Sequence, residues 1–227
     1  MARKVKPREP LSRSRVLTAA VALADTEGLG ALSMRRLGEA LGVEAMSLYK
    51  HVANKEDLLG GIVDLVVGEM ALPAIGRDWK AAMRRRAITA HEVLRRHPWA
   101  TMLIVSRANV GPASLTYVDA TIGCLRAAGF SWALADHAWN AIDSLVYGFT
   151  LQQLNFPFAP EDYARMAEHF LPTLPAGAYP HLRGLSQEVI DRRHDGLHAL
   201  EFGLDLLLDG LERLLPPAPT RGDGGPL

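Results

Sequence analysis

Apolar residues recur every three or four positions along most of the chain, and this spacing predicts α-helices. The first such stripe covers residues 16–24 and follows Ser12, which is suited to cap the first turn of a helix. Gly28 and Gly30 are expected to end this helix. No alternating pattern of useful length predicts a strand, and no internal repeat is present. The pattern therefore predicts an all-α fold.

Three further helices are predicted before Pro73, and they cover residues 34–41, 45–51 and 54–71. Ser33 and Asn54 are the N-caps of the first and the last of these helices. Gly42 separates the first two helices, which are both short. Pro73 ends the third. The first 73 residues are therefore predicted to form a compact group of four helices.

Beyond Pro73 the predicted helices are longer. They cover residues 78–96, 112–128, 131–154, 161–170 and 194–215. The stretch 172–186 is rich in Pro and Gly and is predicted to be mobile. The tail 216–227 is predicted to be disordered for the same compositional reason.

The charge of the chain is zero overall but unevenly distributed. Of its 227 residues, 25 are Lys or Arg and 25 are Asp or Glu. Residues 1–56 carry 10 basic and 6 acidic side chains, which gives +4, so the remainder carries −4. Six of the basic residues lie in the first 15 positions, and four of them, Arg3, Lys4, Lys6 and Arg8, form a basic arm. The uneven distribution favours contact between the N-terminal end and an anionic partner such as DNA.

Cysteine content and hydropathy exclude several classes of protein. The single cysteine, Cys124, permits neither an internal disulfide nor a multi-thiolate zinc site. The basic N-terminus lacks the apolar segment of a signal peptide. Charged residues interrupt every apolar stretch before it reaches the roughly 18 residues of a membrane span. We therefore expect a cytoplasmic protein without a membrane partner.

Two short helices joined at Gly42 and packed by a preceding helix are typical of a helix-turn-helix motif. The second helix of such a pair fits a major groove about 12 Å wide. Ser33, Tyr49 and Lys55 are placed to contact phosphates, and the basic arm could lie on the backbone or in the minor groove. The alternative is an ordinary helical hairpin with a solvated charged face.

The block from Ser33 to Leu59, with its sequence SMRRLG, GV, SLYKHV and NKEDLL, resembles the DNA-binding domain of the TetR family of bacterial repressors. This resemblance implies that Arg35 and three residues of the second helix face base edges, and that the residues after them mainly hold phosphates. The implied DNA-binding residues are Ser33, Arg35, Ala45, Met46, Ser47, Tyr49, Lys50, His51 and Lys55. Arg35 is the best candidate for bidentate contact with a guanine.

The resemblance extends to the C-terminal half, which is similar to the C-terminal domain of tetracycline repressors at Trp79, Gly148 and the segments 129–131, 202–204 and 210–212. It implies a homodimer formed through the 131–154 and 194–215 helices. Gly196, Gly203 and Gly210 lie one heptad apart on the last helix, and such a costly stripe indicates close helix approach. Leucines continue an apolar seam along the same helix, although packing within one chain alone remains open.

The implied domains are an N-terminal arm and helix-turn-helix domain over 1–57, a connecting helix and loop over 58–77, and an effector-binding and dimerisation domain over 78–215. The resemblance places the effector pocket among the 78–96, 112–128 and 131–154 helices. The candidate polar side chains there are Arg86, Thr121, Asp136, Trp139 and Asn140, with Trp99 and His137 nearby. Each alone is more simply structural, so the prediction rests on the set.

The pocket positions depart from those of tetracycline repressors. Ala71 and Ile104 stand where the resemblance implies two histidines, and Gln152 stands where it implies an acid linked to a metal. Arg86 and Ala90 replace an Asn and a Phe. We therefore expect no magnesium–tetracycline chelate and no cofactor, but a metal-free and fairly apolar small-molecule effector.

Other chemistry has less support. His194 and His198 have the spacing of two metal ligands on one helix, with Glu201 a turn later, but solvated histidines are the simpler interpretation and no metal is predicted. His91 and Glu92 begin like a zinc-protease helix, but Arg95 replaces its second histidine. No nucleophile elbow or phosphate loop is present, so no enzyme is predicted.

The leading hypothesis is a homodimeric, ligand-responsive transcriptional repressor that an effector releases from a pseudo-palindromic operator. The alternative is an all-α small-molecule-binding protein or enzyme that uses the C-terminal pocket without binding DNA. DNA affinity separates the two.

Overall fold

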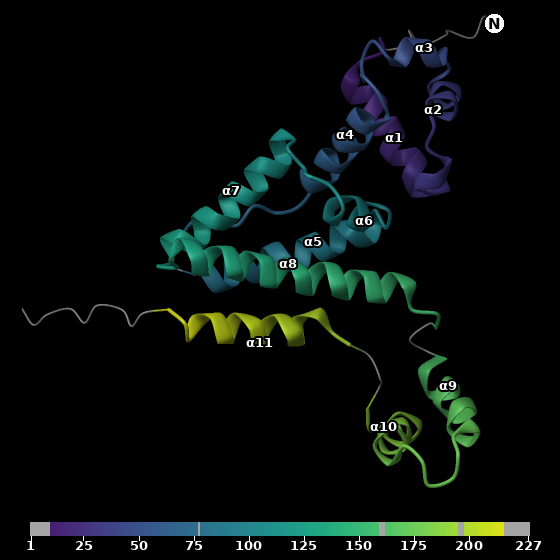
Figure 1. Cartoon of the computed structure of the whole chain (residues 1–227), viewed down its shortest axis with the longest axis vertical. Coiled ribbons are helices and arrows are strands. Elements are labelled where there is room, and N and C mark those ends of the chain that lie inside the picture. Colours follow the sequence, from purple (N-terminus) through teal and green to yellow (C-terminus); the bar gives the residue numbers. More distant parts are fainter. Residues whose placement is uncertain (1–9, 77, 159–161, 195–197, 216–227) are drawn as a thin grey trace, which may run out of the picture.

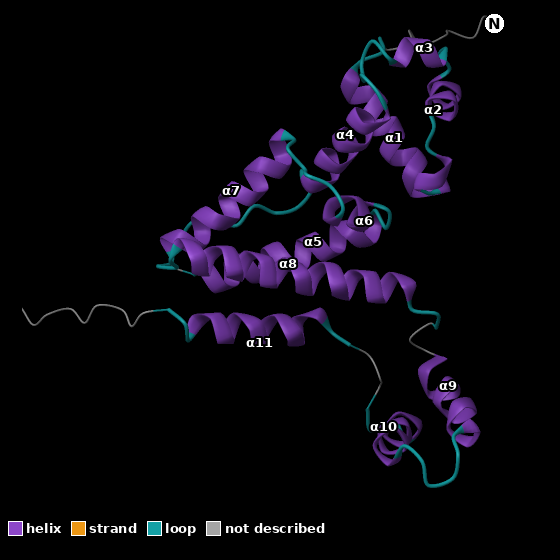
Figure 2. Cartoon of the chain, viewed as in Figure 1, coloured by secondary structure: helices purple, strands orange, loops and turns teal. Residues whose placement is uncertain are grey.

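The computed structural model describes residues 10–76, 78–158, 162–194 and 198–215. Every regular element in these ranges is a helix, which confirms the predicted all-α fold (Figure 2). The first four α-helices are α1 Arg13–Glu27, α2 Met34–Leu41, α3 Ala45–Leu48 and α4 Lys55–Val67. The remaining α-helices are α5 Trp79–Arg96, α6 Ala100–Val105, α7 Pro112–Ala127, α8 Trp132–Asn155, α9 Tyr163–Phe170, α10 Pro180–Ile190 and α11 Leu200–Glu212.

Hydrogen bonds from backbone N–H groups to the capping side chains confirm the predicted helix caps. The hydroxyls of Ser12 and Ser33 accept hydrogen bonds from the backbone N–H groups of residues 15 and 36. The side chain of Asn54 accepts one from the backbone of Asp57. Gly42 adopts the left-handed conformation, with φ of 64°, that ends α2. The start and end of the helix-turn-helix segment are therefore set by local chemistry.

The molecule has two parts that α4 connects (Figure 1). Helices α1 to α4 form the part that we call the head, and α5 to α8 with α11 form the part that we call the body. In the body, α5 packs against α8, and α11 packs against both. Helices α9 and α10 pack against each other and stand apart from the body in Figure 1. A continuous core of buried apolar side chains extends through head and body.

Two predictions after residue 96 need correction, and one helix there was missed. The stretch 172–186, predicted to be mobile, contains a turn of 3₁₀-helix over Leu171–Thr173 and most of α10. Pro180 is the first residue of α10, where proline is favoured because its missing N–H would have no partner. Helix α6 was not predicted because its six residues form an apolar run too short to show a period. The last helix begins at Leu200 and not at residue 194.

Two helices in the head are shorter than predicted. Helix α3 ends at Leu48, and a hydrogen-bonded turn through His51 follows it. Helix α4 ends at Val67, whereas the sequence predicted that it would continue to residue 71. Residues 68–70 form a turn and a bend instead. The predictions on the basic arm before residue 10, on Gly196 and on the tail after residue 215 lie outside the described residues.

Candidate DNA-binding head and effector cavity

The two helices of the motif approach each other closely at Gly38. A Cβ atom added at Gly38 would lie 2.8 Å from the backbone oxygen of Val43. Leu37, Leu41 and Leu48 are buried beneath the pair. The absence of a side chain at residue 38 therefore lets α3 pack tightly against α2, while its other face stays at the surface.

The structure brings the nine predicted DNA-binding residues together on α2, α3 and the segment that leads into α4. Arg35 has 85% of its side chain exposed, and its guanidinium lies 3.4 Å from the carboxylate of Glu39. Five others are also exposed, namely Ser33, Met46, Tyr49, Lys50 and Lys55. Ala45, Ser47 and His51 are partly buried. The set presents cationic and hydrogen-bonding groups at one end of the molecule.

An ion pair between α1 and the start of α4 orders this surface. Arg13 donates to Asp57 at 2.5 and 2.9 Å and to the backbone oxygen of His51 at 2.9 Å. Asp57 also accepts from the backbone N–H of Ala53 at 2.8 Å. The bond from Arg13 has the largest effect on the pKa of the Asp57 carboxyl, and together with the bond from Ala53 it lowers that pKa. Sequence reasoning assigned no role to Arg13, because no local pattern links it to residue 57.

A cavity of about 350 Å³ lies between the end of α4, the segment from α6 to α7, and α8. Its walls include three aromatic rings, those of Tyr117, Trp139 and Tyr147. The other lining residues are Val67, Met70, Ile104, Arg107, Asn109, Ser114, Val118, Asn140, Asp143 and Ser144. Burial raises the pKa of Tyr117 and of Tyr147 far above the ordinary range, so both phenols remain protonated hydrogen-bond donors.

A buried charge lies behind this cavity. Arg86 of α5 is fully buried, and its Nη1 donates to Asp143 at 2.7 Å. The guanidinium also lies 4.4 Å from the centre of the Tyr117 ring. Asp143 accepts further bonds from Trp139 Nε1 at 2.7 Å and from the Tyr147 hydroxyl at 3.4 Å. The only carboxylate among the lining residues is therefore occupied by three donors.

Only some of the predicted effector residues lie at the cavity. Trp139 and Asn140 line the cavity. Arg86 does not line it, but donates to Asp143, which does. Thr121 is buried and donates to the backbone of its own helix. Asp136 and His137 are exposed, and Asp136 accepts from Asn140. Tyr117, Asp143 and Tyr147 were missed, although the last two follow Trp139 at intervals of four on one helix face.

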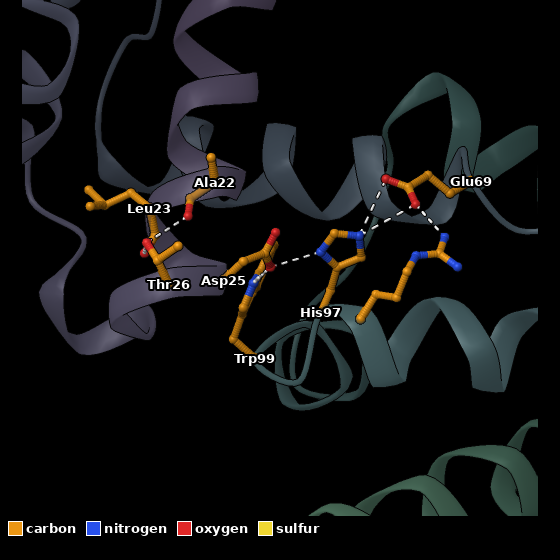
Figure 3. A network of polar contacts seen from close by, with 8 residues as sticks. Ala22, Leu23, Asp25, Thr26, Glu69, His97 and Trp99 are labelled. Atoms are coloured by element: carbon orange, nitrogen blue, oxygen red, sulfur yellow. Dashed lines mark hydrogen bonds and ion pairs between the residues drawn. The ribbon is translucent and has the colours of Figure 1, made fainter.

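Trp99 lies at the junction of head and body, away from the cavity (Figure 3). Its indole Nε1 donates to Asp25 of α1 at 2.7 Å. The imidazole of His97 lies between Asp25 and Glu69, and Arg96 donates to Glu69 at 2.6 Å. Burial opposes ionisation of Glu69, but these contacts with Arg96 and His97 prevail and lower its pKa. The junction is therefore a polar network of partly buried groups.

Helix α11 packs on its own chain through Leu200, Leu204, Leu208 and Leu211, so much of the apolar seam predicted for a dimer is core of this chain. A Cβ atom at Gly203 would lie 3.3 Å from Leu145 of α8, which explains this glycine by close helix approach. The space beside Gly210 is open.

Acidic side chains of α11 pair with basic side chains of α5. Asp205 accepts from Arg84 at 2.8 Å. Lys80 pairs with both Asp209 and Glu212. Phe202 and Leu206 remain on the exposed part of the helix.

In the described part of the chain, His, Cys, Asp and Glu side chains nowhere gather in a group that could hold a metal ion. His194 and His198 line a second cavity of about 240 Å³ with apolar residues of α9 and α10. His198 precedes α11, so the helical spacing predicted for this pair does not apply to the structure. None of the described helices combines the length and apolarity that a membrane crossing requires.

A head with a helix-turn-helix motif and a helical body with a cavity define a DNA-binding regulator with a ligand site. Residues 16–62 match the family model of bacterial regulatory proteins of the tetR family, and residues 72–215 match that of the tetracyclin repressor-like C-terminal domain. The chain therefore belongs to the TetR family, and it is a ligand-responsive helix-turn-helix transcriptional repressor.

Individual relatives agree with this assignment. The transcriptional repressor DrrR1 of Streptomyces coeruleorubidus is 34% identical over 97% of this chain and 83% of its own length. The tetracycline repressor of class D from Escherichia coli is 28% identical over 89% of each chain. The structure of ActR from Streptomyces coelicolor in complex with actinorhodin has a TM-score of 0.74, with 28% identity over 90% of this chain and 98% of that one.

Proposed function

We propose that this repressor contacts its operator through the nine residues of α2, α3 and the start of α4, with Arg35 reading a base and Lys55 holding a phosphate. The observation that supports this assignment most directly is that Arg35 of α2 is exposed, while α3 packs closely against α2 at Gly38 and keeps its other face at the surface. Side chains on such a helix reach base edges in the major groove, whereas lysines near a helix start meet phosphates. A regulator that acts on DNA belongs in the cytoplasm.

TetR-family repressors act as dimers, and we propose that α8 and α11 form the interface in this protein. Two heads related by a two-fold axis match a pseudo-palindromic operator with half-sites about one DNA turn apart. Phe202 and Leu206 support this interface, because both are large apolar side chains that the chain itself leaves exposed on α11. The open space beside Gly210 would allow a partner helix to approach closely.

The cavity lined by Tyr117, Trp139 and Tyr147 is the proposed effector site. Three aromatic walls suit a flat aromatic molecule, and phenol, hydroxyl and amide groups among them suit carbonyl and hydroxyl oxygens on its rim. ActR, which is in complex with actinorhodin in its solved structure, is similar over most of the chain and supports a small-molecule effector.

The lining does not fit a magnesium–tetracycline chelate. Ile104 presents hydrocarbon to the cavity, and the carboxylate of Asp143 is taken by Arg86, Trp139 and Tyr147. A divalent ion requires oxygen ligands that are free to coordinate it. The effector is therefore proposed to be metal-free.

Selection from a random duplex pool with the full chain tests the proposal. Enrichment of an inverted repeat with half-sites one turn apart, bound with a steep salt dependence, is the expected result. A library of polycyclic quinones and phenols is then screened for thermal stabilisation and for release of the selected duplex. Failure to enrich any sequence would contradict the operator assignment, whereas enrichment without ligand release would contradict only the effector class.

A further inference from the structure

The carboxylate of Asp25 makes the polar contact between the head and the start of α6. Its Oδ1 atom accepts from Trp99 Nε1 at 2.7 Å and lies 2.8 Å from Nδ1 of His97. The Asp25 side chain is 27% exposed, whereas those of Trp99 and His97 are buried. Bonds to an ionised acceptor that water reaches poorly are stronger than ordinary surface contacts.

The second nitrogen of His97 is held as well. Nε2 lies 3.3 Å from Glu69, which follows α4 and is fixed in turn by Arg96 at the end of α5. Figure 3 shows the imidazole between the two carboxylates. Glu69 after α4, fixed by the last residue of α5, therefore holds His97 from one side, and Asp25 of α1 holds it from the other.

Helix α6 begins directly after these residues and ends at the cavity. Trp99 is its N-cap residue, while Ile104 near its other end lines the cavity together with Arg107 and Asn109 of the following loop. At about 1.5 Å per residue, the six residues of α6 span only about 9 Å. The residue that donates to Asp25 therefore lies within two helical turns of the cavity wall.

Without this contact the head would depend mainly on α4 for its orientation. Helix α4 belongs to both parts, and its residues Gly60 and Gly61 reduce its helix propensity. From these observations we infer that Asp25 is a positioning residue that makes the head follow α6. Its role in the effector response rests on the proposed function of the cavity, whereas its control of head orientation does not.

The test measures the orientation of the head without DNA or effector. Spin labels are placed on cysteines at Met46 of α3 and Ala133 of α8, both exposed, while the buried Cys124 stays unlabelled. Labelled chains are diluted with unlabelled protein, so that pulsed electron resonance reports the distance within one chain. The wild type is expected to give one narrow distance distribution, and Asp25→Ala to at least double its width.

Two milder variants and one control make the result specific. Asp25→Asn keeps the shape of the side chain, and Trp99→Phe removes the Nε1 donor but keeps an aromatic ring, so both are expected to broaden the distribution less than Asp25→Ala. Glu27→Gln removes another carboxylate of α1 that pairs only within the head, with Arg36 at 2.7 Å, and is expected to leave the width unchanged.

Circular dichroism at the same temperature establishes that each variant is folded. A distribution for folded Asp25→Ala and Asp25→Asn as narrow as that of the wild type would overturn the inference, and so would equal broadening by Glu27→Gln. Neither result would bear on whether the cavity binds an effector, which the ligand screen decides separately.

Discussion

Arg86 and Asp143 form an ion pair across α5 and α8 whose cation is completely removed from water. The exposed fractions of the two side chains are 0% and 16%, and Nη1 lies 2.7 Å from the carboxylate. Nε and Nη2 of Arg86 have no hydrogen-bond partner among the described residues. Asp143 and the ring of Tyr117 therefore provide most of what compensates the buried charge.

Removing only one partner of this pair should destabilise the protein strongly. Asp143→Ala leaves the Arg86 guanidinium buried without its counter-ion, and we expect a loss of about 3–5 kcal/mol in the free energy of unfolding. Urea unfolding at one fixed protein concentration measures the loss. The double variant Arg86→Met with Asp143→Leu should recover most of the stability, because it removes both charges and fills the same space.

The exposed pair of Arg84 and Asp205 is the matched control, since it also joins α5 to another helix of the body. Asp205→Ala should cost less than about 1 kcal/mol, because water screens the pair. If both single variants lost the same stability, Asp143 would have no special importance for Arg86.

DNA binding should separate the two predicted contact types. Arg35→Ala should weaken binding to the selected operator by about 1–3 kcal/mol and relax the preference at one base position. Lys55→Ala should weaken binding to every sequence and reduce the slope of log affinity against log salt by about one. Fluorescence anisotropy with specific and scrambled duplexes measures both effects.

Arg85→Ala is the control for loss of one positive charge, because Arg85 is exposed on α5 in the body and not in the head. It should change neither the affinity nor the salt slope appreciably. An Arg35→Ala variant with lower affinity but unchanged sequence preference would show that Arg35 contacts phosphate only.

The head was predictable because its boundaries are local. Ser12, Ser33 and Asn54 cap helices with their own side chains, and Gly42 ends α2 by its own backbone conformation. Each of these features depends on residues within four positions along the chain. The family resemblance then added the roles of exposed residues, which no local pattern contains.

The cavity was less predictable because its walls come from separate parts of the chain. Trp139 was recognised, but Tyr117 and Tyr147 were not, since their orientation depends on how α7 and α8 pack. Trp99 was placed near the pocket by the family resemblance, yet its indole turns toward Asp25 in the head. A contact across 74 positions leaves no trace in a helical period.

The stability of the head should depend on pH through Asp57. The bond from Arg13 lowers the pKa of this carboxyl below its ordinary value of 3.8. A lowered folded-state pKa stabilises the protein above pH 3.8, and the contribution is lost as the pH falls through the folded-state value. Asp57→Asn should therefore cost about 1 kcal/mol at pH 6, and its difference from the wild type should shrink toward pH 3.

Urea unfolding of the wild type and Asp57→Asn at half-unit steps of pH measures this difference directly. Because both proteins share all other titrating groups, their contributions cancel in the comparison. A difference that stays constant from pH 6 to pH 3 would mean that Asp57 acts by its shape and hydrogen bonds alone, without a change in its ionisation.

The exposed apolar face of α11 should decide the oligomeric state. Phe202 and Leu206 are 73% and 60% exposed in the single chain, and burying such side chains in a partner contributes about 1.5–3 kcal/mol each per subunit. Phe202→Glu combined with Leu206→Glu should therefore give monomers at micromolar concentration in analytical ultracentrifugation. The variant should also lose most of its operator affinity, because one head reaches only one half-site. Ile75→Glu, at an equally exposed apolar position outside α8 and α11, should remain dimeric and bind the operator as the wild type does. Dimers of the double variant with normal operator binding would place the interface elsewhere on the body.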